Sequence, residues 1–390
     1  MLKSLVGAWL AALLALAGCS QSPLPSDPAG EPDASQPSCP ECDPHAWCAR
    51  TDQTVTCTCR DGFTGDGHTC VDVDECAQGT APCDGQHGIC TNTEGGYGCS
   101  CVAGWSLGPD NVTCINGFVA VQVAAGAGYS CAVKRDGTLA CWGSNEYGQA
   151  TPPAGTFKQV SAGEQDSCGL RADGSLICWG WGYGNTTPGY ANYFTSPGGS
   201  FQQVASGPKI GEDEGACGLR TDGKIVCWQD CSEGQCQVPS GTFKQVSTGQ
   251  AHACGLRTDG SVACWGRNDE GQAKSPAGAF QQVSAGEFHN CAVRTDGTVA
   301  CWGYDRIGET KPPSGTFKLV AAGGYFTCGV RTDGTVACWG EGGLGQTTPP
   351  PDSFLDIDAG SAHACGLRTD GRVLCWGYGG NGACTPPAGS

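Results

Sequence analysis

Cysteine is the side chain whose number and spacing offer the most chemistry in this sequence. The 390 residues hold 30 cysteines but only 6 histidines. Thiols at short, regular spacings either hold a metal ion or form disulfides, and the cellular compartment decides between the two. Behind Lys3, the apolar run from Leu5 to Ala17 is typical of an export signal and is short for a bilayer-spanning helix. Export predicts disulfides and argues against a zinc site.

Two further patterns are compatible with catalysis or metal binding. Gly104-Trp-Ser106-Leu-Gly108 matches the G-x-S-x-G motif of esterases, but that motif needs a strand, a sharp turn and a helix. Here it lies between two cysteines of a short cysteine-rich segment. His252, His289 and His363 occupy one position of a repeat, yet the fourth, fifth and seventh copies, which carry them, need not converge on a metal. Because no nucleophile–base pair or catalytic metal set stands in a suitable context, the sequence predicts a protein that is not an enzyme.

Most of the cysteines belong to a hairpin that is written seven times. One copy, CAVRTDGTVACWG, runs from Cys291 to Gly303, and similar phrases surround seven tryptophans. The steps between these tryptophans are 37, 49, 37, 37, 37 and 37 residues, and a fixed period of this length indicates a repeat architecture. The tryptophans are Trp142, Trp179, Trp228, Trp265, Trp302, Trp339 and Trp376.

Each hairpin is expected to place two cysteines opposite each other. In the loop Thr295-Asp296-Gly297, Gly297 suits the left-handed conformation that closes a type I turn with a G1 bulge. With the loop centred on Asp296, Cys291 faces Cys301, and a pair without backbone hydrogen bonds would bring their side chains closest. This register predicts a cross-strand disulfide in every copy; the alternative is reduced, buried cysteines. The predicted pairs are Cys131–Cys141, Cys168–Cys178, Cys217–Cys227, Cys254–Cys264, Cys291–Cys301, Cys328–Cys338 and Cys365–Cys375.

A third strand precedes each hairpin, as in 157–163, whereas Pro152-Pro153 argues against a central strand between copies. Three short strands cannot bury both faces of a sheet alone, but seven such sheets stacked radially can. Residues 118–390 are therefore predicted to form an all-β, seven-bladed β-propeller with three-stranded blades and one disulfide per blade.

The phrase from Ala125 to Gln149, AGAGYSCAVKRDGTLACWGSNEYGQ, resembles the repeat of the regulator of chromosome condensation family. The short period and the ending Gly345-Gln-Thr-Thr-Pro349 are more similar to β-lactamase inhibitory protein II, which implies a seven-bladed propeller with three-stranded blades. Propellers host many functions, so the resemblance implies a fold rather than an activity. The formal net charge of −17 disfavours nucleic acid as a partner, because phosphate binding needs clustered Lys and Arg.

The N-terminal segment resembles the signal peptide of a bacterial lipoprotein. Leu16-Ala-Gly-Cys19 looks like a lipobox, which implies removal of residues 1–18 and lipidation of Cys19. The alternative is an ordinary signal peptide with a chance cysteine. Residues 19–38, rich in Ser and Pro, are predicted to be a disordered tether. The resemblance places the protein in the bacterial cell envelope, at the outer membrane or cell surface, with Cys19 as its only membrane attachment.

Twelve cysteines follow in two sets of six, within 39–70 and 71–114. Six cysteines allow fifteen pairings, so spacing alone does not determine the connectivity. The Cys-x-Cys pairs, followed by Gly62-Phe63 and Gly104-Trp105, resemble EGF-like modules. That family implies the pairs Cys39–Cys48, Cys42–Cys57, Cys59–Cys70, Cys76–Cys90, Cys83–Cys99 and Cys101–Cys114.

The second module resembles the calcium-binding class of EGF-like domains through Asp72-Val-Asp-Glu75 and the segment 90–99. Calcium prefers several oxygen ligands. The resemblance implies side-chain ligands from three residues (Asp72, Glu75 and Asn92) and carbonyl ligands from three more (Val73, Thr93 and Gly96). The alternative is a calcium-free module with a solvated acidic segment. The first module lacks the acidic signature, and no calcium is expected there.

Function in a propeller is expected where the repeat departs from itself. The 49-residue step holds twelve extra residues in two insertions, and the second carries Glu212, Asp213 and Glu214. The first carries the aromatic residues Trp181, Tyr183, Tyr190, Tyr193 and Phe194. Exposed aromatic side chains favour the binding of proteins or sugar rings. The alternative is that they fold back and cap the propeller.

Three cysteines remain outside these sets. Cys231 and Cys236 are expected to close a small ring of their own, and Cys384 is left as a buried free thiol or an intermolecular link. Together these patterns predict a monomeric, surface-anchored lipoprotein that acts as a recognition or adhesion module, with a propeller head that binds a protein or glycan. The alternatives are an enzyme inhibitor of the β-lactamase inhibitory protein type and a structural protein of the envelope.

Overall fold

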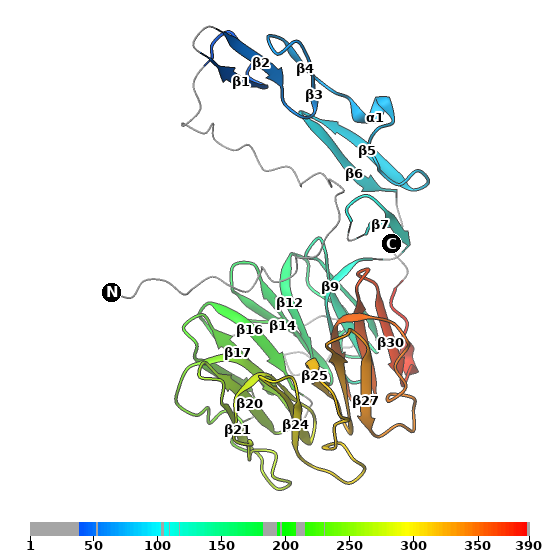
Figure 1. Ribbon diagram of the computed structural model, residues 1–390. Coiled ribbons are helices and arrows are strands. Elements are labelled where there is room, and N and C mark those ends of the chain that lie inside the picture. Colours follow the sequence, from blue (N-terminus) through cyan, green and yellow to red (C-terminus); the bar gives the residue numbers. More distant parts are fainter. Residues whose placement is uncertain are drawn as a thin grey trace, which may run out of the picture. The chain divides into compact units, whose positions relative to one another are not determined.

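The computed structural model describes residues 39–51, 54–102, 105–108, 110–116, 118–181, 193–195, 197–207, 215–229 and 231–387. The chain divides into two compact units, whose elements are drawn in Figure 1. The first holds the described residues up to Ala81 together with Cys90–Gly98; the second holds Pro82–Ile89 together with those from Cys99 onward. Within these ranges, no helix combines the length and the apolar character that a membrane crossing requires.

Short strands and disulfides make up residues 39–116, where little core is available and cross-links take its place. The single-turn helix α1 (Glu75–Gln78) starts at Asp74, whose side chain accepts the N–H of Ala77 at 2.8 Å. The strands are β1 (Ala46–Arg50), β2 (Val55–Cys59), β3 (Phe63–Gly65), β4 (Cys70–Asp72), β5 (Gly88–Thr93), β6 (Gly96–Cys101), β7 (Trp105–Leu107) and β8 (Cys114–Asn116). The disulfides are Cys39–Cys48, Cys42–Cys57, Cys59–Cys70, Cys76–Cys90, Cys83–Cys99 and Cys101–Cys114.

Seven antiparallel sheets follow and form the predicted seven-bladed propeller. Each inner strand contacts the inner strands of both neighbouring blades, and β28 contacts β9, which closes the ring. In the order inner, middle and outer strand, the blades are β9 (Ala120–Ala125), β10 (Tyr129–Lys134) and β11 (Leu139–Gly143); β12 (Phe157–Ala162), β13 (Asp166–Arg171) and β14 (Leu176–Gly180); β16 (Phe201–Ser206), β17 (Gly215–Arg220) and β18 (Ile225–Gln229); β19 (Phe243–Thr248), β20 (His252–Arg257) and β21 (Val262–Gly266); β22 (Phe280–Ala285), β23 (His289–Arg294) and β24 (Val299–Gly303); β25 (Phe317–Ala322), β26 (Phe326–Arg331) and β27 (Val336–Gly340); β28 (Phe354–Ala359), β29 (His363–Arg368) and β30 (Val373–Gly377).

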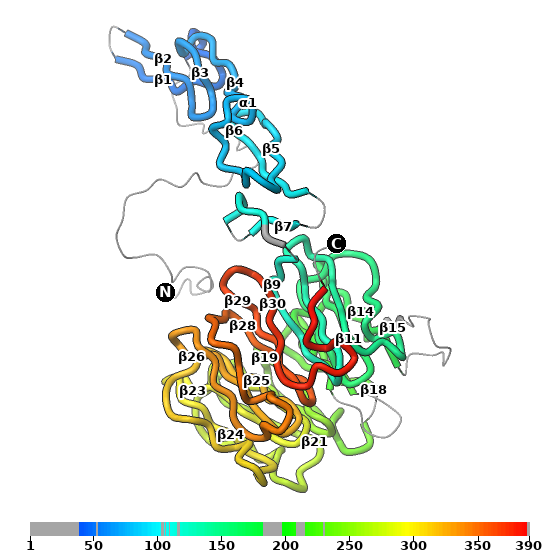
Figure 2. The backbone as a smooth tube through the Cα atoms, turned by 90° about the vertical axis from the view of Figure 1, so that its right-hand side faces the viewer, coloured from blue at the N-terminus to red at the C-terminus, as the bar shows by residue number. Residues whose placement is uncertain are grey.

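Blade 2 differs from the expected three-stranded pattern. A fourth strand, β15 (Tyr193–Thr195), pairs antiparallel with β14 (Figure 2). It belongs to the first insertion, which therefore extends the sheet of blade 2 at its outer edge.

The hairpins have the predicted register and cross-links. Gly297 has φ +85°, the N–H of Arg294 donates to the carbonyl of Thr298, and the carboxylate of Asp296 accepts the N–H of Thr298 at 2.9 Å. Cys291 lies opposite Cys301 with their Cα atoms 4.1 Å apart, and the disulfide joins them. The same cross-strand disulfide is present in all seven blades.

The blades are joined by glutamine side chains at the third position of the inner strands. Gln245 accepts the N–H of Val283 in the next blade at 3.0 Å and donates to the Val283 carbonyl at 3.0 Å. Its amide thus satisfies both polar groups at the free edge of the neighbouring strand. We call this set the glutamine belt; its members are Gln122, Gln159, Gln203, Gln245 and Gln282.

The belt is interrupted where the ring closes. Leu319 and Asp356 take the glutamine position in blades 6 and 7. Between blades 7 and 1, Asp358 accepts the N–H of Ala125 at 2.9 Å instead. His363 Nε2 and Ser130 Oγ, 2.8 Å apart, make a second link across this seam.

The C-terminal segment completes blade 1. In five blades the indole N–H of the repeat tryptophan donates to a backbone carbonyl in the segment that follows the preceding blade. Trp265, for example, donates at 2.6 Å to the carbonyl of Gln235, which lies seven residues after Trp228, and the other four blades use the same spacing. For Trp142 that carbonyl comes from Ala383, at 2.8 Å. Figure 2 shows the C-terminal segment beside β11. The ring is thus closed by residues from both ends of the propeller sequence.

The glutamine belt predicts a specific loss of stability. Gln245→Ala leaves the buried N–H and carbonyl of Val283 without partners, and we expect the free energy of unfolding to fall by about 2 kcal/mol. Reversible denaturant unfolding with intact disulfides measures the change. The neighbouring exposed Lys244→Ala is the control, expected within about 0.5 kcal/mol of the parent. Equal midpoints for the two variants would refute the role assigned to the belt.

Candidate functional site

The two ends of the propeller differ in what they carry. At one end, the hairpin end, lie the Asp-Gly turns of the blades. The chain enters here, because the N–H of Ala120 donates to the Gly371 carbonyl and the N–H of Arg135 to the Val119 carbonyl. At the other end, the mouth end, the inner strands finish and the middle strands begin. The described loops there are 126–128, 163–165, 249–251, 286–288, 323–325 and 360–362.

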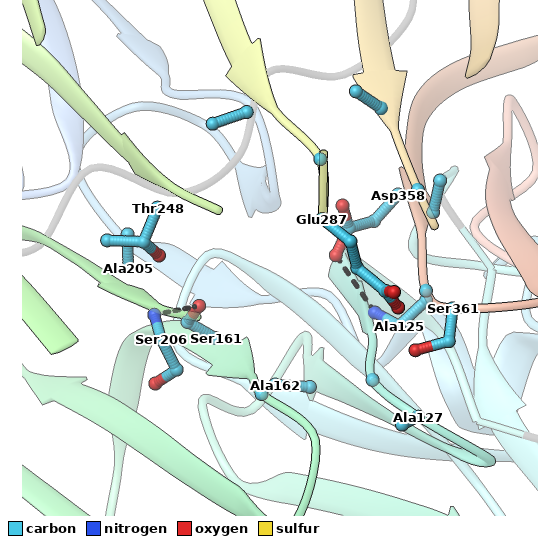
Figure 3. A pocket seen from close by; sticks show the side chains of 18 of the residues that line it. Ala125, Ala127, Ser161, Ala162, Ala205, Ser206, Thr248, Glu287, Asp358 and Ser361 are labelled. Carbon is cyan, nitrogen blue, oxygen red and sulfur yellow. Dashed lines mark hydrogen bonds between the residues drawn. The ribbon is translucent and has the colours of Figure 1, made fainter. Parts of the chain in front are cut away.

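A cavity of about 110 Å³ opens at the mouth end of the central channel. The ends of all seven inner strands line it, mostly with Gly, Ala and Ser. Its carboxylates are Glu164, Glu287 and Asp358. Figure 3 shows Glu287 and Asp358 on one side of this view and the hydroxyls of Ser206 and Thr248 on the other. Oxygen atoms are thus the polar side-chain groups that face the cavity.

The enclosed position of these carboxylates changes their acidity. Burial raises the pKa of Asp358 to about 7, although the Ala125 N–H opposes the rise. Burial also raises the pKa of Asp356, deeper in the channel wall, to about 6. The pKa of Glu287 is raised by burial and by the negative charge of Glu164, while the nearby hydroxyl of Ser361 offsets part of the effect. The cavity therefore favours any positive charge that enters it.

An aromatic cluster lies beside the cavity, on blades 5 and 6. The ring of Phe288 stacks on that of Tyr325 with centroids 5.1 Å apart, and Tyr304 meets Tyr325 edge-on at 5.5 Å. All three rings are half-buried, and Arg306 lies 5.2 Å from the centre of the Tyr304 ring. The pKa of Tyr325 is raised by burial and then by the charge of Glu287, which connects the cluster with the cavity.

This cluster lies outside the insertions, where the sequence led us to expect function. A comparison of the repeats position by position holds the signal. Before the middle strand, blades 5 and 6 carry Phe288 and Tyr325, where other blades carry Gly128, Gln165, Ala251 and Ala362.

The five aromatic residues of the first insertion are only partly within the described structure. Trp181 is half-buried and meets Tyr147 edge-on, with ring centroids 4.8 Å apart. The backbones of Tyr193 and Phe194 pair with β14, and their side chains lie outside the described residues. Tyr183 and Tyr190 lie outside them altogether, as do residues 212–214 of the second insertion.

Both insertions are attached at the mouth end. Trp181, which directly follows β14, donates its N–H to the Gln165 carbonyl at 3.0 Å. The N–H of Gly207 donates to the Gly215 carbonyl at 2.9 Å, on either side of the second insertion. The attachment points of both insertions, the aromatic cluster and the cavity therefore belong to one end of the propeller.

The three repeat histidines are links between blades and do not converge. His252, His289 and His363 are buried, and each Nε2 lies within 2.8 Å of a side-chain oxygen on the next blade. Burial lowers the pKa of each to about 4. Within the described ranges, the one group of three candidate metal ligands is Cys39, Cys42 and Cys48, which are joined in disulfides.

Ser106 does not lie in the setting of an esterase nucleophile. It stands within strand β7 and pairs with Ile115 of β8, and β8 is the next described element along the chain. Among the remaining cysteines, Cys231 and Cys236 form a disulfide. Cys384 is free and half-buried, and burial raises the pKa of its thiol. Cys19 lies outside the described residues.

The residues expected to bind calcium surround the end of β4. Asp72 accepts a hydrogen bond from the Asn92 amide at 2.8 Å and one from the N–H of Gly95 at 2.6 Å. Oε2 of Glu75 is buried without a hydrogen-bond partner. The carboxylates of Asp72 and Glu75 and the amide oxygen of Asn92 are the kind of ligands that a hard cation prefers. The unsatisfied oxygen of Glu75 is free to bind such a cation. Thr93 and Gly96 flank the β5–β6 turn beside them, and Val73 follows β4.

These features define a class of protein, one in which EGF-like modules precede a repeat propeller. Family models match the EGF domain over 39–70 and the calcium-binding EGF domain over 72–114. The regulator of chromosome condensation (RCC1) repeat matches residues 120–149, 157–185, 243–272, 280–306, 317–346 and 354–383. The chain thus carries two EGF-type domains, one of the calcium-binding type, followed by a propeller of RCC1 repeats.

Curated relatives resemble only a short part of the chain. Human nidogen-1 is 43% identical over 91 residues, which are 22% of this chain and 7% of nidogen-1. Rat uromodulin is 47% identical over 72 residues, which are 18% of this chain and 11% of uromodulin. The chain therefore spans about a tenth or less of these relatives.

Two solved structures resemble the propeller. The ectodomain of the receptor kinase CR4 from Physcomitrella patens has a TM-score of 0.55 and 22% identity, over 68% of this chain and 74% of its own. The CRINKLY WD40 ectodomain of the receptor kinase ACR4 from Arabidopsis thaliana has a TM-score of 0.53 and 26% identity, over 70% of this chain and 100% of its own. Both structures are ectodomains of receptor kinases, and the likeness supports the propeller fold.

The buried histidines and the channel carboxylates have opposite effects on stability as the pH changes. Between pH 6.5 and about 4 the unfolded chain protonates His252, His289 and His363 and the folded chain does not, so their contribution is full above pH 6.5 and is lost towards pH 4. Asp356 and Asp358 have raised pKa values, so their contribution is full below pH 3.8 and is lost as the pH rises to about 7. The carboxylates therefore offset the histidines in this range.

We expect the Asp356→Asn/Asp358→Asn variant to lose stability more steeply than the parent between pH 6.5 and 4.5. In the parent, each of the two carboxyls takes up a proton on folding in this pH range, and the amides of the variant do not. Their replacement therefore makes the free energy of unfolding change with pH by up to about 2.7 kcal/mol per pH unit more. Reversible unfolding at several pH values measures both slopes. Asp259→Asn is the control, because the exposed carboxylate of Asp259 has a lowered pKa and titrates below this range. Parallel curves for the double variant and the parent would contradict the assignment.

Proposed function

We propose that the protein is a surface-anchored lipoprotein of the bacterial cell envelope and acts as a non-catalytic recognition or adhesion module. Its propeller binds a protein or glycan partner at the mouth end. The observation that carries the proposal is the difference between the two ends of the propeller. The chain enters at the hairpin end, whereas the mouth end holds the cavity, the aromatic cluster and the attachment points of both insertions.

The aromatic cluster supports binding rather than stability alone. Phe288, Tyr304 and Tyr325 remain half-exposed, although larger rings elsewhere in the blades, such as Trp179, are fully buried. Rigid aromatic side chains lose little entropy on binding and offer faces to sugar rings or apolar side chains. Arg306 and Glu287 add charged groups beside the same rings.

The anchor and the spacer complete the proposal. Lipidated Cys19 holds the chain in the membrane, and residues 19–38 form the tether. The two EGF modules then form a stiff joint. Gly62 leaves room for the Gly95 carbonyl, which would lie 2.2 Å from an added Cβ, and the N–H of Val73 donates to the Gly62 carbonyl at 2.8 Å.

Calcium bound by Asp72, Glu75 and Asn92, with the carbonyls of Val73, Thr93 and Gly96, would hold the same joint in place. We expect Asn92→Ala to weaken calcium binding at least tenfold, because it removes one of three side-chain ligands. Calorimetric titration of the chelator-treated chain measures the affinity. Asp66→Asn in the first module, whose carboxylate accepts the N–H groups of His68 and Thr69, should leave it unchanged. Identical affinities in both variants and the parent would refute the site.

The binding face is tested by crosslinking capture from native envelope and culture extracts, with glycan arrays in parallel. We expect Phe288→Ala/Tyr304→Ala/Tyr325→Ala to weaken the captured partner's affinity at least tenfold, because the rings are half-exposed contact surface. Leu355→Ala, an exposed apolar residue of β28 near the hairpin end, is the control and should bind like the parent.

The other outcomes separate the competing functions. Capture that survives the loss of the aromatic cluster would move the site to another surface. No partner with any bait would favour a structural role in the envelope. Inhibition of a β-lactamase by stoichiometric protein would replace adhesion with enzyme inhibition.

A further inference from the structure

The mouth-end loops of blades 5 and 6 expose two aliphatic side chains. Ile307, in the loop after β24, is 53% exposed, and Leu344, in the loop after β27, is 52% exposed. Both occupy one position of the repeat, five residues after the tryptophan of the blade, where blades 3, 4 and 7 carry Glu233, Glu270 and Asn381. Because other blades have polar residues there, the fold itself does not require an apolar side chain at this position.

Both aliphatic residues stand on turns that are fixed by buried side chains. The carboxyl of Glu309 accepts the N–H of Ile307 at 2.9 Å, and the amide of Gln346 accepts the N–H of Leu344 at 2.9 Å. A contact surface that is already ordered loses less conformational entropy when a partner binds. The two exposed side chains are therefore well placed to make contacts with a partner.

The same loops are joined to the aromatic cluster through the backbone. The N–H of Tyr304, at the start of the first loop, donates to the carbonyl of Phe288 at 3.1 Å. The N–H of Glu341, at the start of the second loop, donates to the carbonyl of Tyr325 at 2.9 Å. Each exposed aliphatic residue lies three positions further along its loop. We call the whole set the blade 5–6 patch; its members are Phe288, Tyr304, Arg306, Ile307, Tyr325 and Leu344.

The composition of the patch suits a protein partner better than a glycan. The rings of Phe288 and Tyr325 stack on each other with an interplanar angle of 26°. The guanidinium of Arg306 lies over the ring of Tyr304. Part of the ring surface on which a sugar could stack is thus already covered. Exposed aliphatic side chains offer a sugar neither a flat face nor a hydrogen bond, whereas grouped apolar, aromatic and Arg side chains are typical of protein interfaces.

Charge determines which kind of protein fits the patch. In the segments that carry it (286–288, 303–311, 323–325 and 340–348), four carboxyl groups stand against two cations. The carboxyls are those of Glu287, Asp305, Glu309 and Glu341, and the cations are Arg306 and Lys311. A partner that carries Lys or Arg is therefore attracted, whereas a second copy of this chain, with a formal net charge of −17, is repelled.

The acidity of Tyr325 agrees with this balance of charge. Burial raises the pKa of its hydroxyl, and the nearby charges that add to the rise include those of Glu287, Glu341 and Glu309. Three of the four carboxyls thus act on a ring of the patch itself.

We propose that the blade 5–6 patch docks a protein segment in which apolar side chains are flanked by Lys or Arg. Ile307, Leu344 and the aromatic cluster contact the apolar side chains, and the surrounding carboxyls attract the basic ones. This inference rests on the proposed recognition function and specifies the kind of partner.

Fluorescent synthetic peptides of equal length test this chemistry on the whole chain. One alternates Leu and Lys, the second Leu and Glu, and the third Ser and Lys; chitohexaose and cellohexaose are the glycan probes. We expect the Leu/Lys peptide to bind about tenfold more tightly than either other peptide, and more weakly as the salt concentration rises. Equal binding of the Leu/Lys peptide and either other peptide would overturn the proposal. Binding of a hexaose without that of any peptide would make the partner a glycan and overturn it too.

Matched variants locate the docking surface. Ile307→Ser/Leu344→Ser should weaken binding of the Leu/Lys peptide about tenfold, because the two aliphatic contacts are lost. Val121→Ser/Leu355→Ser is the control, since these residues are 53% and 55% exposed and lie near the hairpin end. It should change the affinity less than about twofold, and both variants should keep the melting midpoint of the parent. Equal effects of the two pairs on peptide binding would refute the docking surface.

A second pair of variants separates local charge from the net charge of the chain. Glu341→Gln should weaken binding of the Leu/Lys peptide about threefold at low salt. Glu146→Gln removes the same charge from an exposed position on blade 1 and should have less than half of that effect. Equal losses of affinity would mean that only the net charge attracts the peptide, which would overturn the proposal.

The outcome is distinguishable from that of the proposed function. If a partner captured through the aromatic cluster still binds the Ile307→Ser/Leu344→Ser variant and no peptide binds, recognition stands and this docking surface is wrong. If Leu/Lys binding depends on Ile307 and Leu344 while no partner is captured, the docking surface stands and the recognition of a partner in those extracts is wrong.

Discussion

The free edge of each inner strand is the constraint on which the propeller depends. A three-stranded blade leaves backbone N–H and carbonyl groups unpaired at the channel, and buried groups of this kind are costly. In five blades a glutamine of the belt hydrogen-bonds to these groups on the neighbouring inner strand. It can do so because its primary amide has a donor and an acceptor, as a backbone peptide does. One side chain therefore satisfies the strand edge and joins neighbouring blades, as Gln159 does with Val204. The disulfides cross-link each hairpin, but the belt connects the blades.

The positions that leave the belt shape the channel. In the last blade, Asp356 takes the position of the belt glutamines and Asp358 takes a position that is Ser or Ala in the other blades. The Ala125 N–H donates to the carboxylate of Asp358. Enclosure in the channel raises the pKa of both groups. The repeated residues thus stabilise the ring, and the residues that differ from the repeat, Asp356 and Asp358, bring carboxyl groups into the channel. The aromatic cluster follows the same rule, because Phe288 and Tyr325 stand at a position where the other described blades carry Gly, Gln or Ala.

The incoming chain is attached at one end of the propeller, and the cavity and the aromatic cluster lie at the other. Hairpin turns and the incoming chain occupy one end, where Asx-type bonds such as that of Asp296 make the backbone rigid. The described loops of the other end differ between blades, as Phe288 and Tyr325 show. The EGF-type domains before the propeller depend on their six disulfides, because segments of this size are too small for a core of their own.

The sequence alone determined the blade number, the hairpin register and the blade disulfides. These features are local, because a turn such as Asp296-Gly297 sets the register of residues only ten apart. The tertiary structure decided the rest. Ala383 completes blade 1, β15 extends blade 2, and three rings from separate loops meet at Tyr325. Such contacts depend on how the blades pack around the closed ring. Ala383 keeps the seven-residue spacing of the repeat, but only ring closure brings it to Trp142. The structure likewise joined repeat histidines to neighbouring blades, because burial favours a neutral imidazole with a nearby hydrogen-bond partner over a distant shared metal.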